Sequence, residues 1–363
     1  MAGTQVVTAE DEARALAGAL EVRRFRPRED DARDRFVAEH ARGRLFQLAG
    51  WRRAVERVFG HEPRDLCAWR GQELVGLLPL SRCRGLLGRS HLISVPYGVY
   101  AGPLGADRAV ERALVDEAVR AAEAEGVGRL ELRCLEDPGL EHLAASDLYA
   151  TFRRRLPDDP AEVLMTMRKD ERRLVRRARD RHGLELCEGS WYVADLARLF
   201  HASKHRLGSP GLPAAWFQAL ADELGERAVV HLARRAGRAL AASMSFVHGD
   251  ALAMYYIGTT PEANREYATT SFMIAGLQEW AVARGLRTFD LGRSRRGSGA
   301  FTYKVNQGFE PTPLHYRYAL VKSAGPPIFT PSNPRTRLLR KAWSRLPQWL
   351  SLRLSERLAR RLP

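Results

Sequence analysis

The sequence predicts a mixed α/β protein that contains two copies of one module. Short apolar segments typical of β-strands occur in both halves. In each half, a helix that stops at a glycine leads into one more strand, as in "AVRAAEAEGVGRLELR" (118–133) and "GLQEWAVARGLRTFDLG" (276–292). The repeated unit is too long for a solenoid period, so the pattern indicates two modules packed together.

The first half contains the elements of one such module. The stretch 35–63 predicts amphipathic helices, because its apolar residues recur at helical spacing. Residues 66–82 form two apolar runs around a Gly-Gln turn, which favours a hairpin. The stretch "HLISVPYGVYAGPLG" (91–105) predicts a third strand that ends in a loop. Residues 107–126 predict a helix with Asp107 near its N-cap and a glycine stop, and a strand follows.

The second half repeats this order. Residues 228–258 predict three strands joined by two turns. Residues 269–285 predict a helix capped by Thr269 or Thr270, and "LRTFDLG" (286–292) predicts the strand after it. Between the two halves, the arginine-rich stretch 163–189 predicts a helix with one apolar face. Its arginines form either a solvated helix face or a binding site for phosphate groups.

The amino-acid composition says more about possible binding partners than about the fold. The 363 residues carry a net charge of +15, with a pI of about 10.2. This balance favours nucleic acid, phosphorylated substrates or an anionic membrane as partners, although a high-GC genome also enriches arginine. The four cysteines are far apart and have no metal-ligand spacing, and no signal peptide or membrane span is evident. We therefore expect a reduced, cytoplasmic protein.

The end of the chain has a different character. From residue 326 onward, leucines and Trp343 recur at helical spacing while arginines occupy the other positions. This pattern predicts either a helix that closes over the first module or a basic amphipathic segment in peripheral contact with the inner face of an anionic membrane.

Several stretches together resemble the GNAT acyltransferases, and in particular their FemAB-like branch with two GNAT modules. The most specific is "FDLGRSRRGSGAFTYKVNQGFEPTPLHY" (289–316). Weaker ones are "LVGLLPL" (74–80), "LISVPYGVYAGPL" (92–104), "RKDERRLVRRARDRHGLEL" (168–186) and "SNPRTRLLRKAWSRLP" (332–347). The chain is most similar to FemAB-related proteins of exosortase/PEP-CTERM and exopolysaccharide gene clusters, whose domain is also called a BioF2-like acetyltransferase.

The resemblance implies two tandem GNAT-like modules, at 1–155 and 156–325, and a basic amphipathic tail at 326–363. It also implies N-acyl transfer to an amine of an envelope or exopolysaccharide-related acceptor. The donor is acyl-CoA or aminoacyl-tRNA, and no firmly bound cofactor is expected. CoA-dependent relatives carry a glycine-rich pyrophosphate loop, whereas "REYATT" (265–270) has no glycine, which counts against conventional acetyl-CoA use.

The resemblance places Lys304 in an aromatic–lysine–glycine context, where it would stabilise the charge that develops on the donor carbonyl. Other candidates follow from position. Arg293, Ser294 and Arg296 follow a strand end, where guanidinium groups can bind phosphate in a two-pronged manner. The pairs Tyr97/Tyr100 and Tyr255/Tyr256 stand at corresponding places in the two modules, each after a third strand. Asn264, Arg265 and Asp290 complete the predicted substrate-binding set.

Other patterns in the sequence are weaker evidence for a functional site. His201 and His205 have metal-compatible spacing but no third ligand, so we expect no metal site. The acidic run near Glu29 is typical of a solvated loop. The sequence shows no activated cysteine or serine, which favours direct transfer without a covalent enzyme intermediate. The alternative function is a non-catalytic double-GNAT scaffold that binds an anionic sugar-lipid or a partner at the membrane. The sequence does not determine the oligomeric state.

Overall fold

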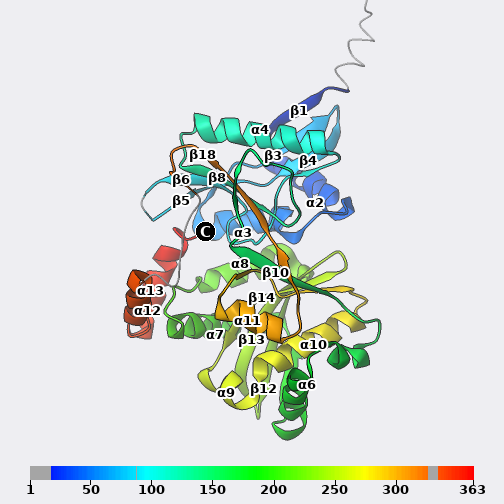
Figure 1. Ribbon diagram of the computed structural model, residues 1–363, viewed down its shortest axis with the longest axis vertical. Helices are drawn as coiled ribbons and strands as arrows, with labels where there is room; N and C mark the ends of the chain where they lie inside the picture. The colour runs from blue at the N-terminus through cyan, green and yellow to red at the C-terminus, as the bar shows by residue number, and fades with distance from the viewer. Residues whose placement is uncertain (1–17, 87, 326–333) are drawn as a thin grey trace, which may run out of the picture.

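The computed structural model describes residues 18–86, 88–325 and 334–363, with side chains in the last range from Leu338 onward. The two expected modules and the tail are therefore described except for residues 1–17, 87 and 326–333. Figure 1 shows two α/β halves stacked along the long axis of the molecule, with the C-terminal helices at one side of the boundary between them.

The first half contains two sheets that share the helix α4. The four-stranded sheet has the order β1 (Leu20–Arg24), β3 (Leu66–Arg70), β4 (Glu73–Leu78), β7 (Leu104–Gly105). The six-stranded sheet has the order β2 (Glu62–Pro63), β5 (Ser81–Arg84), β6 (Ser90–Ser94), β8 (Arg129–Cys134), β18 (His315–Leu320), β9 (Ala144–Ser146). The helices are α2 (Asp30–Glu39), α3 (Ala49–Phe59) and α4 (Arg108–Ala124).

The second half is built on one eight-stranded sheet. Its order is β11 (Glu185–Glu188), β12 (Ala228–Arg235), β13 (Arg238–His248), β14 (Ala251–Thr259), β15 (Thr288–Asp290), β10 (Tyr149–Arg155), β16 (Ser294–Arg295), and β17 (Pro311–Pro313) also pairs with β10. The helices are α5 (Val163–Thr166), α6 (Lys169–Arg176), α7 (Val193–Arg206), α8 (Ala214–Leu224), α9 (Pro261–Tyr267), α10 (Thr269–Ala283) and α11 (Gly299–Asn306).

The repeated strand–helix–strand unit is confirmed. In the first half, α4 joins β6 to β8, and these two strands pair in parallel. In the second half, α10 joins β14 to β15, which also pair in parallel. Asp107 caps α4 as predicted, because its carboxylate accepts a hydrogen bond from the Val110 amide at 2.8 Å.

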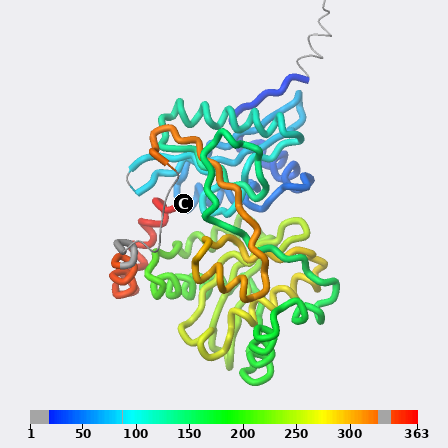
Figure 2. Tube along the Cα trace, in the orientation of Figure 1, coloured from blue at the N-terminus to red at the C-terminus, as the bar shows by residue number. Residues whose placement is uncertain are grey.

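The two halves exchange strands, which the sequence did not reveal. β10 precedes the expected boundary at residue 155, yet it pairs antiparallel with β15 of the second sheet. β18 lies in the second half of the chain but pairs antiparallel with β8 of the first half. The two crossing segments run side by side between the halves, and the Leu314 amide donates to the Tyr149 carbonyl at 3.1 Å (Figure 2). Each sheet is therefore completed by the other half of the chain.

A shared apolar core lies between the halves. Trp51 of α3 and Trp216 of α8 are fully buried, and their rings meet edge to face with centroids 5.4 Å apart. Phe246 of β13 lies 5.8 Å from the Trp51 ring. At the rim of this core, Arg53 of α3 forms an ion pair with Glu223 of α8 at 2.7 Å. Buried aromatic contact of this kind opposes independent motion of the halves.

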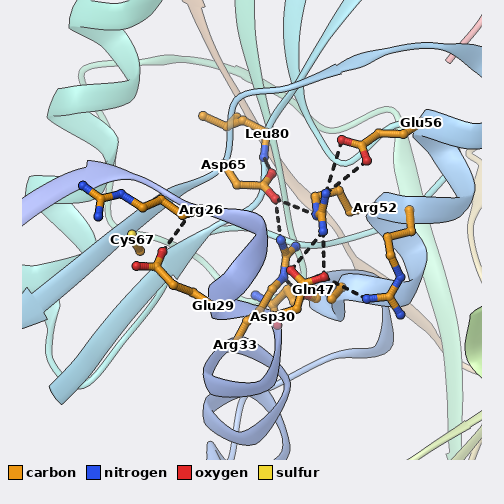
Figure 3. A network of polar contacts seen from close by, with 12 residues as sticks. Arg26, Glu29, Asp30, Arg33, Gln47, Arg52, Glu56, Asp65, Cys67 and Leu80 are labelled. Carbon is orange, nitrogen blue, oxygen red and sulfur yellow. Dashed lines mark hydrogen bonds and ion pairs between the residues drawn. The ribbon is translucent and has the colours of Figure 1, made fainter. Parts of the chain in front are cut away.

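A buried ion-pair network fixes the helices of the first half (Figure 3). Arg33 is fully buried, pairs with Asp65 and donates to the Gln47 carbonyl at 2.6 Å. Arg52 donates to both carboxylate oxygens of Asp30, at 2.9 and 2.8 Å. The prediction of a solvated acidic loop near Glu29 is therefore wrong, because Asp30 begins α2 and anchors this network.

The tail forms two helices, α12 (Pro334–Trp343) and α13 (Gln348–Ala359). α13 lies along α7 of the second half, where Ser351 Oγ is 3.3 Å from His201 Nε2 (Figure 1). His205 Nε2 is 2.8 Å from the Leu346 carbonyl oxygen, so both histidines of α7 make polar contacts that hold the tail in place. The expectation that the tail closes over the first module is thus only half right. Its body packs on the second half, and only its end reaches the first, where Tyr97 donates to the Ala359 carbonyl at 2.9 Å.

Candidate functional site

Asp290 is the centre of a polar cluster at the boundary between the two halves. It stands at the end of β15 and is 2% exposed. Its carboxylate accepts hydrogen bonds from the Tyr100 hydroxyl at 2.6 Å, the Thr151 hydroxyl at 2.9 Å and the Gly292 amide at 2.7 Å. Burial and then the neighbouring carboxylate raise the pKa of Tyr100 well above its ordinary value, so the phenol stays a hydrogen-bond donor.

Lys304 lies beside this carboxylate, on a helix and not on a strand. Ser298 caps that helix, α11, by accepting a hydrogen bond from the Phe301 amide. Lys304 Nζ donates to the carbonyl oxygens of Leu291 at 2.6 Å, Gly292 at 2.8 Å and Arg293 at 3.3 Å. Burial lowers its pKa to about 8, while Asp290 acts to raise it and Arg293 to lower it. The lysine therefore holds the turn that follows β15.

Arg293 extends the cluster toward the first half. Its Nη1 donates to the Tyr316 hydroxyl at 3.0 Å, and its guanidinium carbon lies 4.5 Å from the centre of the Tyr149 ring. The Tyr316 hydroxyl donates in turn to the Val99 carbonyl at 2.5 Å. We call Tyr100, Thr151, Asp290, Arg293, Lys304 and Tyr316 the seam cluster. Its members come from both halves of the chain and from both exchanged strands.

The predicted tyrosines divide into two groups. Tyr97 and Tyr100 follow β6, as expected, whereas Tyr255 and Tyr256 lie within β14 and not after it. The Tyr255 hydroxyl donates to the Tyr97 carbonyl at 2.7 Å, which joins this pair to the boundary. Tyr256 instead accepts from Trp216 Nε1 at 2.9 Å inside the apolar core. All four tyrosines therefore lie at the boundary, with the ring of Tyr256 in its apolar core, 4.7 Å between centroids from the ring of Tyr255.

The remaining predicted site residues lie outside the seam cluster, and those with hydrogen bonds or ion pairs make them within their own surroundings. Asn264 Oδ1 accepts from the Thr270 amide at 2.9 Å, so it caps the start of α10, and the exposed Arg265 pairs with Glu266. Ser294 is buried in β16. Arg296 donates from Nε to the Asp147 carbonyl at 2.9 Å. None of these four has a contact with the seam cluster through its side chain among the described residues.

The structure also adds residues that the sequence interpretation missed. Tyr303 precedes Lys304, and its hydroxyl is 3.3 Å from Ser271 Oγ in the first turn of α10. Burial raises its pKa, so it remains protonated. Thr151, Tyr149 and Tyr316 belong to the exchanged segments, whose position the sequence did not reveal. Tyr303 could have been predicted from the sequence, because it adjoins Lys304 in "TYKVNQGF" (302–309).

A pocket opens beside Tyr100 on the first half. Its charged lining residues are Arg42, Arg44, Arg108, Glu111, Glu136 and Asp137. The carboxylates are paired: Glu136 with Arg44 at 2.8 Å, and Glu111 with Arg108 at 3.0 Å and also with Arg42. Such a pocket offers both hydrogen-bond acceptors for an amine and donors for an acidic group.

Thiol chemistry is disfavoured at three of the four cysteines. Burial raises the pKa of Cys67 to about 11 and that of Cys134 to about 12, and it raises the pKa of Cys83 further. The thiolate, not the thiol, is the effective nucleophile. In the described part of the chain, no group of three or more histidine, cysteine, aspartate or glutamate side chains is arranged to hold a metal ion.

The structure has two fused α/β modules that meet at the seam cluster. Residues 165–305 match the family described as "Acetyltransferase (GNAT) domain". The second half of the chain therefore carries a GNAT acyltransferase domain, and the chain as a whole has the fold of FemX and of a tandem GNAT protein. No curated protein matches the sequence.

Solved structures support the tandem fold. The structure described as FemX is 15% identical and superposes with a TM-score of 0.61, covering 81% of this chain and 96% of that chain. L-PGS from Bacillus licheniformis is 14% identical with a TM-score of 0.56, covering 89% of this chain and 98% of that one. A tandem GNAT protein from the clavulanic acid biosynthesis pathway is 14% identical with a TM-score of 0.53, covering 85% and 100%.

Proposed function

We propose that the protein transfers an acyl or aminoacyl group from a phosphate-bearing donor to an amine of an envelope or exopolysaccharide-related acceptor. The observation that carries this proposal is the seam cluster, in which Tyr100 of the first module donates to Asp290 and Lys304 of the second module binds the turn that follows Asp290. The GNAT match supports acyl transfer. The acceptor class and the exosortase/PEP-CTERM context stay predictions from the sequence resemblance.

The reaction needs no covalent enzyme intermediate. The acceptor amine attacks the donor carbonyl, so a C–N bond forms and the thioester C–S or ester C–O bond breaks. Lys304 exchanges its longest contact, 3.3 Å to the Arg293 carbonyl, for the oxygen that becomes negatively charged. The leaving thiolate or alkoxide takes a proton from Tyr303, and the proton released by the amine restores the phenol.

The donor phosphates are proposed to meet the arginines of α6 and the turn after it. Arg173, Arg176, Arg177 and Arg181 are exposed there, and only Arg173 has an ion pair, at 3.8 Å to Asp170, among the described residues. The backbone at the start of α10 is less suited to a CoA pyrophosphate. The Thr270 amide is already bonded to Asn264, and Ala268 takes up the left-handed region at φ 51° without being glycine. These features favour aminoacyl-tRNA over acyl-CoA.

We also propose that the protein works in the cytoplasm, in contact with the inner face of an anionic membrane. Among the described residues, no helix combines the length and the apolar character needed to cross a bilayer. The support for contact with the membrane is the tail, which carries arginines beside exposed apolar side chains.

The proposed activity is tested by incubating the purified protein with charged tRNA or acyl-CoA and candidate amino sugars, and by detecting the amide product. Lys304→Ala is expected to lower the rate by about 100-fold or more, as loss of an oxyanion donor does. Lys322→Ala, which removes an exposed lysine, is the matched control and should retain full activity. If no donor gives a product and Lys304→Ala leaves the cellular phenotype unchanged, the scaffold alternative holds instead.

A further inference from the structure

The helix α13 buries a stripe of small side chains and leaves two large apolar ones, Trp349 and Leu352, exposed. Ser351 and Ser355 are fully buried and Ala359 is 3% exposed, because this stripe packs against α7 and the following loop. Trp349 on the opposite side is 62% exposed, and Leu352 is 38% exposed. A helix whose packing is satisfied by small residues has no structural need for an exposed tryptophan.

Cations surround these apolar side chains. From Leu338 to the last residue, the chain carries seven lysines and arginines and one acid, Glu356. The guanidinium carbon of Arg353 lies 5.9 Å from the centre of the Trp349 ring. Arg353, Arg357 and Arg360 follow the tryptophan at helical spacing on the exposed side, and none of them has an ion pair in the described part of the chain. We call Trp349, Leu352, Arg353 and Arg357 the tail face.

The end of α13 also completes a basic pocket on the first module. Arg360 and Arg361 line it together with Arg82 and Arg84 of β5, around a volume of about 330 Å³. We call these four residues the arginine pocket. Four guanidinium groups that converge in one pocket repel one another unless an anion binds between them.

The nearby carboxylates do not neutralise this pocket. Arg82 is 3.5 Å from Glu125 and 4.0 Å from Glu62. Both acids bind Arg64 more closely, at 2.8 and 2.6 Å. Glu62 is the one carboxylate among the residues that line the pocket, so a phosphate group would still meet an excess of positive charge.

We propose that the tail face and the arginine pocket dock the protein on an anionic phospholipid bilayer, with Trp349 and Leu352 in the interface and a lipid phosphate in the pocket. This inference rests on the membrane contact proposed above, and it identifies the residues that would make that contact. Tryptophan favours the headgroup level, and each arginine near an anionic surface strengthens binding by roughly fivefold. The Tyr97 hydroxyl donates to the Ala359 carbonyl and the Tyr97 carbonyl accepts from the Tyr255 hydroxyl, so the end of α13 is joined to both modules.

The test is co-sedimentation of the full chain with vesicles of phosphatidylcholine alone and with vesicles that also contain phosphatidylglycerol. The wild-type protein should bind the anionic vesicles at least about tenfold more tightly. Arg84→Glu with Arg361→Glu should remove most of that preference, and Trp349→Ala should weaken binding severalfold. The control, Arg112→Glu with Arg120→Glu on the exposed side of α4, makes the same change in net charge and should bind like the wild type.

Three outcomes would overturn the inference. The first is equal binding to both kinds of vesicle. The second is equal loss in the α4 control, which would mean unspecific attraction by net charge. The third is saturation of the pocket by inorganic phosphate while Trp349→Ala has no effect on vesicle binding, which would indicate a site for a free anion. Transfer to soluble substrates should be unchanged in these variants, so failure of docking is distinct from failure of the proposed function.

Discussion

The two modules share a crossover helix between parallel strands but differ in the charge at its start. In the first module, Asp107 caps α4, and the buried Glu111 follows in the first turn. In the second module, Ala268 precedes α10, whose first turn carries no acid of its own. A helix N-terminus favours anions, and a resident carboxylate uses up that preference. This difference agrees with the proposal that the donor phosphates bind the second module, at the arginines of α6, and that the first module binds the acceptor.

The start of α10 does meet a carboxylate, but that carboxylate belongs to another helix. Glu171 of α6 is the carboxylate that reaches α10, and it is held by Ser271 at 2.7 Å and Gln307 at 2.6 Å. The exposed cationic side chains of α6 are Lys169, Arg173 and Arg176, against the single exposed acid Asp170. By contrast, the pocket beside Tyr100 in the first module contains three carboxylates. The side proposed for the donor is thus mainly basic, whereas the side proposed for the amine carries charges of both signs.

The largest expected effect concerns the core that joins the modules. Trp216→Ala should lower the free energy of unfolding by about 3–5 kcal/mol, because it leaves a cavity in a fully buried aromatic cluster. Denaturant titration measures this loss, and both modules should unfold in one transition because each holds a strand of the other. Trp191→Ala, at a side chain 73% exposed, should change the stability by less than about 0.5 kcal/mol. Two separate transitions in the wild type would contradict the shared core.

The next effect tests the charge contrast directly. Arg176→Glu at the end of α6, combined with Arg177→Glu in the turn after it, should raise the KM for the donor by about tenfold at low salt, and this rise should shrink as salt screens the charges. The matched charge reversal on α4, Arg112→Glu with Arg120→Glu, should leave that KM unchanged. If the α4 pair causes the same rise, the two modules do not differ as donor sites.

A smaller effect is expected from pH. Lys304 must carry its proton to stabilise the developing charge, so activity should fall as the pH rises through about 8. Its pKa is lowered from an ordinary value of 10.5, so the folded protein binds fewer protons than the unfolded chain between about pH 8 and 10.5. The contribution of Lys304 to stability should therefore rise with pH over that window while activity falls. The residual activity of Lys304→Arg should lack this decline.

The sequence predicted the elements better than their pairing. Helical spacing, the Asp107 cap and the glycine stops located α4 and α10 with the strands that follow them. The exchange of β10 and β18 was not predictable, because "YATFRRR" (149–155) and "HYRYAL" (315–320) alternate in a way that suits either sheet. The contact of Tyr100 with Asp290, 190 positions apart, depends on that exchange. Lys304 was singled out from its neighbours, but its three carbonyl partners follow from the packing of α11.

The most direct test of the assignment of donor and acceptor sides is hydrogen exchange of the full chain with and without a non-reactive charged-tRNA or acyl-CoA analogue. The account predicts slower exchange in α6 and in the first turns of α10, with no change in the first turns of α4. Protection of α4 and not of α10 would contradict it, because the donor would then bind the module whose helix begins with its own carboxylates.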